Sequence, residues 1–150
     1  MLKIGEADYQ ELRRHGEEAY PHEACGVLMG RAEGGGRVVA RVARCANTRV
    51  DSPHNRYGID PLEILRALHQ GREREEDVVG FYHSHPDHPA LWSATDLAEA
   101  HWVGCSYVIT SVARGIAEAT NSFLLVGGDA GRRERSFLDE EIRVTRRGDA

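Results

Sequence analysis

The pattern of apolar and polar residues in the first third of the chain predicts one surface helix and a set of strands. Residues 6–19 place scattered apolar residues among charged ones and end before Tyr20 and Pro21, which is typical of an amphipathic helix. The short apolar run 24–30, closed by glycine, predicts a buried strand. Residues 31–45 contain a glycine triplet followed by valine-rich sequence, which predicts a hairpin.

A long loop and a second helix are predicted to follow. Residues 46–59 hold Asn, Pro, Ser and Gly without periodicity, and loops of this length are often functional. Asp60 is placed to cap a helix in which Pro61 is the first residue, and Gly71 predicts its end. Three leucines of this helix are predicted to share one face: Leu62, Leu65 and Leu68.

The second half of the chain predicts strands around one short helix. The helix is expected within 93–102. Strands are expected at 77–85, 105–113, 119–127 and 135–145. Residues 1–150 are therefore predicted to form a single α/β (α+β) domain, in which about three helices pack on one central mixed sheet.

The composition narrows the class of protein. Hydrophobic residues make up 41% and charged residues 29% of the 150 positions, which is typical of one globular domain. A net charge of −5 argues against broad nucleic-acid binding. No apolar run approaches the roughly 18 residues of a membrane helix, and the first residues lack the apolar core of a signal peptide. We therefore expect neither nucleic acid nor membrane as a partner.

The number and spacing of the cysteines indicate in which cellular compartment the protein is expected. An odd number of cysteines without C-x-x-C spacing argues against a disulfide framework and against a cysteine-rich zinc module. These residues are Cys25, Cys45 and Cys105. A reducing cytoplasm is the expected setting.

A metal site is predicted where histidines crowd the end of one strand. His83 and His85 are two apart on a predicted strand, so their side chains leave the same face. Asp96 lies eleven residues beyond His85 and can fold back onto the pair at the start of the next helix. Two histidines and one carboxylate leave a fourth position for water, which is typical of catalytic rather than structural zinc.

A simpler interpretation competes for part of this pattern. Ser93 and Asp96 form an S-x-x-D capping box, so helix capping alone could explain both residues. Paired histidines on a strand can also be ordinary surface residues. The full H-x-H-x7-S-x2-D spacing, however, is expected by chance in roughly one sequence of this composition in a thousand. The two interpretations are compatible, since a capping serine is held close to the metal.

The same residues carry a family resemblance. The pattern His83-Ser-His85-Pro-x6-Ser93-x2-Asp96 resembles the signature of the JAMM/MPN+ (JAB) metallopeptidase family. The segment PHEACGVLMG around Glu23 resembles the glutamate-bearing segment that completes this signature. The order of the elements also resembles the MPN/JAB fold, with its cytidine-deaminase-like architecture, over most of the chain. The insertions of the eukaryotic deubiquitinating members are lacking, so the chain looks more like the stand-alone bacterial and archaeal members.

The resemblance implies a role for each matched residue. His83, His85 and Asp96 would hold one Zn²⁺ per chain together with a water. Glu23 would act as general base and then general acid, and Ser93 would donate a hydrogen bond to the oxyanion. The implied reaction is hydrolysis of the amide bond after the C-terminal Gly-Gly tail of a ubiquitin-like or sulfur-carrier protein. The leaving group could be a protein or a single amino acid such as cysteine.

Several other residues near these positions could be either functional or purely structural. His88 and His22 are expected to be solvated, although each lies beside a predicted site residue. Cys25 is a conceivable nucleophile, but a buried thiol is the more ordinary explanation. Ser84 should point to the opposite face of its strand and be structural. The loop 46–59 either lines a substrate groove or is purely structural, and its candidate groove residues are Asn47, Arg56 and Tyr57.

Two other functions share this fold pattern. A catalytically inactive MPN-type binding module would have lost metal ligands, whereas every ligand of the signature is present here. DNA-repair-associated JAB proteins usually carry Asn between the two histidines and an N-terminal helix-hairpin-helix region. This chain has Ser84 at that position. Homo-oligomerisation is left open by the sequence.

Overall fold

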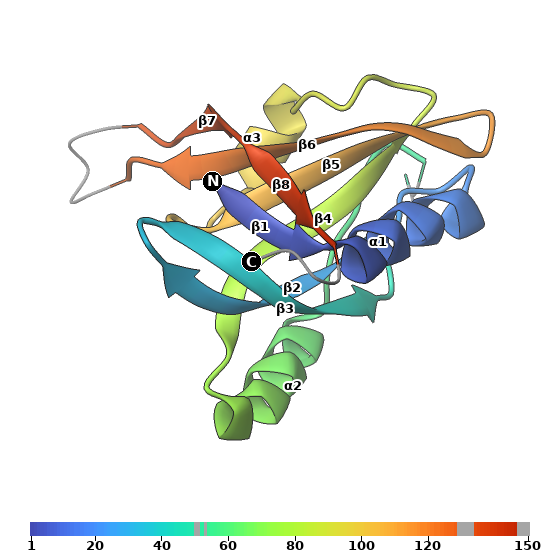
Figure 1. Cartoon of the computed structure of the whole chain (residues 1–150). Helices are drawn as coiled ribbons and strands as arrows, with labels where there is room; N and C mark the ends of the chain where they lie inside the picture. Colours follow the sequence, from blue (N-terminus) through green and yellow to red (C-terminus); the bar gives the residue numbers. More distant parts are fainter. Residues whose placement is uncertain (50–51, 53, 129–133, 147–150) are drawn as a thin grey trace.

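A computed structural model gives the fold and describes residues 1–49, 52, 54–128 and 134–146 (Figure 1). It confirms a mixed α+β architecture with one central sheet and three α-helices. In chain order the elements are β1 (Leu2–Gly5), α1 (Glu6–Ala19), β2 (Cys25–Glu33), β3 (Gly36–Cys45), α2 (Pro61–Gly71), the 3-10 helix η1 (Arg72–Arg74), β4 (Asp77–Pro86), α3 (Ala94–Glu99), β5 (Ser106–Ala113), β6 (Ile116–Val126), β7 (Ser136–Glu140) and β8 (Ile142–Thr145).

The described strands form one eight-stranded mixed sheet in the order β7-β6-β5-β4-β2-β3-β1-β8. The central strand β4 pairs antiparallel with β2 and parallel with β5. The two edge strands are consecutive in the chain, so the sheet curves until its edges approach each other. Leu2 of β1 donates its backbone N–H to the carbonyl of Glu141, between β7 and β8, at 2.8 Å. Arg37 of β3 reaches Glu140 of β7 at 2.7 Å.

Two hydrophobic cores lie on opposite faces of this sheet. Neighbouring residues of β2 alternate between them, with Val27 in one core and Leu28 in the other, and both are fully buried. α1 covers one core and contributes Leu12, whereas α2 covers the other and contributes Ala67. Because β2 is buried on both faces, its first residues form a continuous apolar run rather than an alternating pattern.

Most predicted elements are confirmed, and two strand predictions need correction. β1 was not predicted. The single strand expected over 135–145 is wrong, because β7 ends at Glu140 and β8 begins at Ile142. The chain changes partner at this point: β7 pairs with β6, whereas β8 pairs with β1. One uninterrupted strand could not reach both neighbours.

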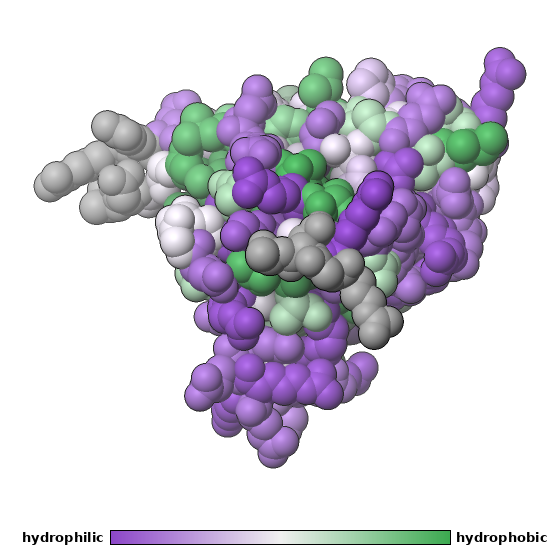
Figure 2. All heavy atoms as spheres, viewed as in Figure 1, coloured by the Kyte–Doolittle hydropathy of each residue, from purple (hydrophilic) through white to green (hydrophobic). Residues whose placement is uncertain are grey.

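The face of α2 also differs from the prediction. Ile64, Ala67 and Leu68 pack toward the core, while Leu62 and Leu65 are 64% and 59% exposed. The buried stripe follows the i, i+3, i+4 spacing, shifted from the leucines that the sequence suggested. On the face viewed in Figure 2, hydrophilic residues cover the lower lobe, where Figure 1 places α2. The cap of α2 is as predicted, since the Asp60 side chain accepts from the backbone N–H of Leu62 at 3.0 Å.

The glycines of the β2–β3 hairpin occupy backbone conformations that require them. Gly34 and Gly35 have φ values of 58° and 80°, and both lie in the turn, whereas Gly36 already belongs to β3. Left-handed conformation at both central residues is typical of a type I′ turn, which glycine adopts at little cost. Within the described residues, no helix combines the length and the apolar character needed to cross a membrane.

Candidate metal centre

The C-terminal end of β4 presents two histidines on one face of the sheet. His83 and His85 are 2% and 8% exposed, and their Nε2 atoms lie 3.1 Å apart. Because β4 is paired on both sides, neighbouring strands fix the backbone of this end: His83 pairs with Cys25 of β2 and with Ile109 of β5. The predicted same-face arrangement is therefore present and rigidly supported.

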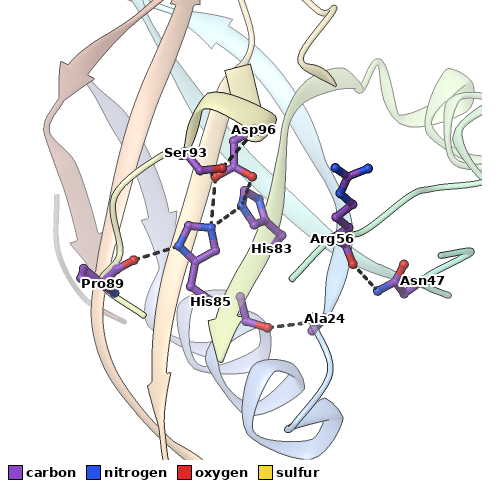
Figure 3. A network of polar contacts seen from close by, with 9 residues as sticks. Ala24, Asn47, Arg56, His83, His85, Pro89, Ser93 and Asp96 are labelled. Carbon is purple, nitrogen blue, oxygen red and sulfur yellow. Dashed lines mark hydrogen bonds and ion pairs between the residues drawn. The ribbon is translucent and has the colours of Figure 1, made fainter. Parts of the chain in front are cut away.

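The first turn of α3 brings a carboxylate to the pair. Ser93 is the N-cap residue, and its Oγ accepts from the backbone N–H of Asp96 at 3.0 Å. In return, the backbone N–H of Ser93 donates to Asp96 Oδ2 at 2.9 Å. The capped carboxylate faces the histidines: Oδ1 lies 3.3 Å from His83 Nε2, and Oδ2 lies 3.1 Å from His85 Nε2 (Figure 3).

These three side chains fit a metal ion by spacing and by protonation. A zinc ion bound tetrahedrally at about 2.0–2.1 Å places its ligand atoms roughly 3.3 Å apart, close to the separations seen here. Burial lowers the pKa of His83, so its imidazole is neutral. Burial alone would raise the pKa of Asp96, but hydrogen bonds from His83 and His85 hold it well below its usual range. Neutral imidazole and ionised carboxylate are the forms that bind metals, so His83 and Asp96 are already in the required forms. With His85 they make up a group that could hold a metal ion.

The second nitrogen of His85 orients its ring. Nδ1 contacts the backbone carbonyl of Pro89 at 2.8 Å, so this nitrogen carries the hydrogen and Nε2 is left to face the site. Burial lowers the pKa of His85, but the contacts with Asp96 and Pro89 outweigh this and raise it. The turn that supplies the Pro89 carbonyl is itself anchored. Asp87 accepts from the Tyr20 hydroxyl at 2.6 Å and from the Arg114 backbone N–H at 2.8 Å.

A tyrosine from the 46–59 loop packs against the other histidine. The ring of Tyr57 stacks on His83, with the ring centroids 4.4 Å apart and the planes 21° from parallel. His83 Nδ1 is buried and has no hydrogen-bond partner among the described residues. Metal-binding histidines usually donate a hydrogen bond through their second ring nitrogen; at His83, the ring of Tyr57 instead packs on the face of the imidazole. The sequence suggested Tyr57 only as a residue lining a groove.

Glu23 lies in the short connection between α1 and β2 and is 4% exposed. The next residue, Ala24, is fixed to β4 by Ser84: the Ala24 N–H donates to Ser84 Oγ at 2.8 Å, and the Ser84 N–H donates to the Ala24 carbonyl at 3.1 Å. Ser84 is thus structural, as predicted. Burial raises the pKa of Glu23 to about 8; His85 opposes this rise, and Asp96 adds to it.

A pocket of about 360 Å³ is lined by both Glu23 and His85, one of the three candidate metal ligands. Its lining consists of Glu23, Asn55, His85, His88, Pro89, Leu91, Ser93 and Thr95. Glu23 Oε1 is buried without a hydrogen-bond partner among the described residues, which leaves it available to accept a proton. Ser93 Oγ already accepts from the Asp96 backbone, so its hydroxyl hydrogen is free to donate into the pocket.

Comparison with known proteins identifies the family. Residues 5–125 match the family model described as prokaryotic homologs of the JAB domain. The chain belongs to this family. The JAB domain is 38% identical over 91 residues to a desampylase of Haloferax volcanii, covering 61% of this chain and 63% of that protein. It is 38% identical over 103 residues to a probable TtuB-protein conjugate cleaving protease of Thermus thermophilus, covering 68% of this chain and 65% of that protein.

The likeness to a solved structure extends over nearly the whole JAB domain. The solution structure of a protein from Desulfitobacterium hafniense superposes with a TM-score of 0.78 at 29% identity, covering 98% of this chain and 96% of that one. The matches to the two curated relatives, in contrast, span less than two thirds of the length of each.

The remaining candidates of this JAB domain lie outside the ligand group. His88 lines the pocket but is exposed and is not one of the three ligands, and His22 is exposed. Cys25 is fully buried, and burial raises the pKa of its thiol to about 12, which argues against a nucleophile. Arg56 is exposed. Asn47 is engaged by its side chain with the backbone rather than facing a groove.

Proposed function

We propose that the chain is a zinc-dependent peptidase or isopeptidase that hydrolyses the amide bond after the C-terminal Gly-Gly tail of a ubiquitin-like or sulfur-carrier protein. One observation carries the proposal: a buried carboxylate with an unpartnered oxygen, Glu23, shares a pocket with His85, which belongs to a group of two histidines and one aspartate. The names of the two relatives, a desampylase and a TtuB-protein conjugate cleaving protease, support this class of reaction.

Zinc is the metal that suits these ligands. Two imidazoles and one carboxylate are typical of catalytic zinc sites with an open fourth position, and the separations of 3.1–3.3 Å fit tetrahedral coordination. We propose His83, His85 and Asp96 as its ligands. When bound, a zinc ion supplies Lewis-acid polarisation of the scissile carbonyl and lowers the pKa of a bound water toward about 7.

Glu23 and Ser93 supply the proton transfer and the oxyanion contact. Glu23 accepts a proton from the attacking water and passes it to the leaving amine, so the amine departs neutral. Its pKa, raised by burial to about 8 without metal, suits a group that alternates between base and acid near neutral pH. Ser93 donates its free hydroxyl hydrogen to the carbonyl oxygen as negative charge develops there.

The two sides of the site are chemically different. Glu23 must reach the leaving nitrogen, so the leaving group occupies the pocket that Glu23 lines. A second pocket of about 300 Å³ is lined by Tyr57, whose ring stacks on His83. Part of its lining is aromatic and aliphatic, and the ion pair of Arg49 with Glu99 also lines it. The apolar residues are Tyr57, Ile59, Ile64, Phe81, Trp102 and Tyr107. This side suits the apolar part of a carrier tail that precedes the glycines.

A cleavage assay tests the proposal. The substrate is a carrier protein with a Gly-Gly tail, joined in one version to a lysine side chain and in another to a single cysteine. We expect at least one of the two substrates to be cleaved after the second glycine. Mass spectrometry of the products identifies the bond that is cut. A chain that binds the carrier tightly but cleaves neither version would instead be an inactive binding module.

A further inference from the structure

The side chain of Asn47 forms a complete set of hydrogen bonds beside the candidate site. Its Nδ2 group donates to the backbone carbonyl of Glu23 at 3.2 Å. It also donates to the backbone carbonyl of Arg56 at 3.0 Å (Figure 3). Its Oδ1 accepts from the backbone N–H groups of Arg49 at 3.0 Å and Gly58 at 3.1 Å. Two donated and two accepted bonds satisfy every position of a primary amide.

The oxygen and the nitrogen of the Asn47 amide bond to different parts of the structure. Among the residues that the structure describes, Oδ1 accepts hydrogen bonds from Arg49 and Gly58 of the 46–59 loop and so joins the two ends of this loop. A backbone bond from the Thr48 N–H to the Gly58 carbonyl, at 2.9 Å, supports the same closure. Nδ2 bonds the loop carbonyl of Arg56 and, in addition, links the loop to the carbonyl of Glu23. The closing bonds of Oδ1 and Thr48 do not involve Nδ2, whereas the link to Glu23 depends on that group.

Glu23 is held from two directions as a result. On its C-terminal side, Ala24 is bound to β4 through Ser84, which lies between the two histidines. At its own carbonyl, Glu23 is bound to the loop through Asn47. The loop in turn carries Tyr57, whose neighbours on both sides bond to the Asn47 amide and whose ring stacks on His83. The Asn47 side chain thus connects the backbone of Glu23 to the loop segment whose Tyr57 ring stacks on His83.

We propose that Asn47 is a positioning residue that aligns Glu23 with the metal ligands through the hydrogen bond from its Nδ2 group. The inference rests on the proposed function, because it assumes that Glu23 transfers the proton. A displacement of about 1 Å in a catalytic group can cost roughly a hundredfold in rate. Loss of the Nδ2 contact should therefore slow the chemical step while leaving the ligands His83, His85 and Asp96 in place.

Two variants separate the tasks of the amide. Asn47→Asp keeps an oxygen that accepts from Arg49 and Gly58 but removes the donor to the carbonyls of Glu23 and Arg56. We expect the backbone amides of Arg49 and Gly58 to stay protected from hydrogen exchange in this variant. Zinc content should stay at one per chain and KM within threefold of wild type. The kcat, in contrast, should fall about 10- to 100-fold. Asn47→Ala should lose both the protection and the rate.

A matched control accounts for a general loss of stability. Asp60→Ala removes another side-chain contact to the backbone, the cap of α2, at the end of the same loop. We expect it to lower the melting temperature as much as Asn47→Asp or more, with kcat unchanged. The inference is overturned if Asn47→Asp turns over at the wild-type rate, or if Asp60→Ala loses as much rate for the same loss of stability.

A double-mutant cycle tests whether Asn47 acts through Glu23. Under single-turnover conditions with excess enzyme, Asn47→Asp should have no further effect in a Glu23→Gln background. If it slows the residual reaction there by the same factor as in wild type, the inference is wrong while the proposed function stands. If Glu23→Gln itself keeps the wild-type rate, the proposed function is wrong, and the inference falls with it.

Discussion

Ser93 and Asp96 each hydrogen-bond the backbone of the other, and the same Asp96 carboxylate completes the group of three side chains that could hold a metal ion. Asp96 Oδ2 accepts from the Ser93 N–H at 2.9 Å and lies 3.1 Å from His85 Nε2. The capping box and the candidate metal centre therefore share an atom. Because the cap fixes the carboxylate relative to α3, the start of this helix also sets the position of the third ligand.

Replacing Ser93 should affect stability and catalysis by separate routes. Ser93→Ala removes the cap, which should lower the free energy of unfolding by about 1 kcal/mol. It also removes the proposed oxyanion donor, which should lower kcat by about 10²- to 10³-fold. Chemical denaturation and steady-state kinetics measure the two effects, and Ser93→Thr, which keeps a hydroxyl, should retain most of the activity.

Asp60→Ala is the control for the capping effect, because it removes a side-chain cap from α2. It should lose similar stability without loss of kcat. A Ser93→Ala enzyme whose kcat stays within threefold of wild type would show that Ser93 serves only as a cap.

The stability of the metal-free protein should depend on pH through Glu23. Burial raises the pKa of Glu23 to about 8, above the roughly 4.3 of an unfolded glutamate, so the folded state keeps this proton between those values. The stabilisation is fully present below pH 4 and is lost as pH rises toward 8, by on the order of 3–5 kcal/mol. Denaturation in the presence of chelator should show wild type losing stability relative to Glu23→Gln across this range; parallel curves would contradict the assignment.

The stacked ring of Tyr57 should contribute to metal affinity. Tyr57→Phe keeps the ring over His83, so we expect its zinc affinity within threefold of wild type. Tyr57→Ala removes the ring from beside a histidine whose Nδ1 has no hydrogen-bond partner among the described residues, and should weaken zinc binding about 10-fold. Competition with a chromophoric chelator measures both affinities. Equal affinities in the two variants would mean that the ring does not support the ligand.

Those parts of the site that depend on local geometry were predictable from the sequence. The two-residue spacing of His83 and His85 and the three-residue spacing of Ser93 and Asp96 are set by strand and helix periodicity. Both relationships appear in the structure as expected. Glu23 was distinguished from the other glutamates only by its neighbours, because the apolar run that follows it predicts a buried strand and the surrounding segment carries the family resemblance.

Features that depend on partners distant in the sequence were not predictable in the same way. Asn47 is one polar residue of an irregular loop, and nothing in its surroundings indicates that its amide reaches the Glu23 carbonyl. Tyr57 likewise gains its role only when the loop folds over β4. β1 was missed because the four residues Leu2–Gly5 are too few to show a period, and they become a strand by pairing with β3 and β8.

The most direct test of a metal centre served by Glu23 measures zinc content and cleavage rate together in wild type and Glu23→Gln. We predict about one zinc per chain in both proteins. Wild-type cleavage of a Gly-Gly-tailed carrier conjugate should stop with chelator and return with added zinc, while Glu23→Gln should be slower by about 10²- to 10⁴-fold. Absence of zinc from the wild type, cleavage untouched by chelation, or an undiminished rate in Glu23→Gln would contradict the account.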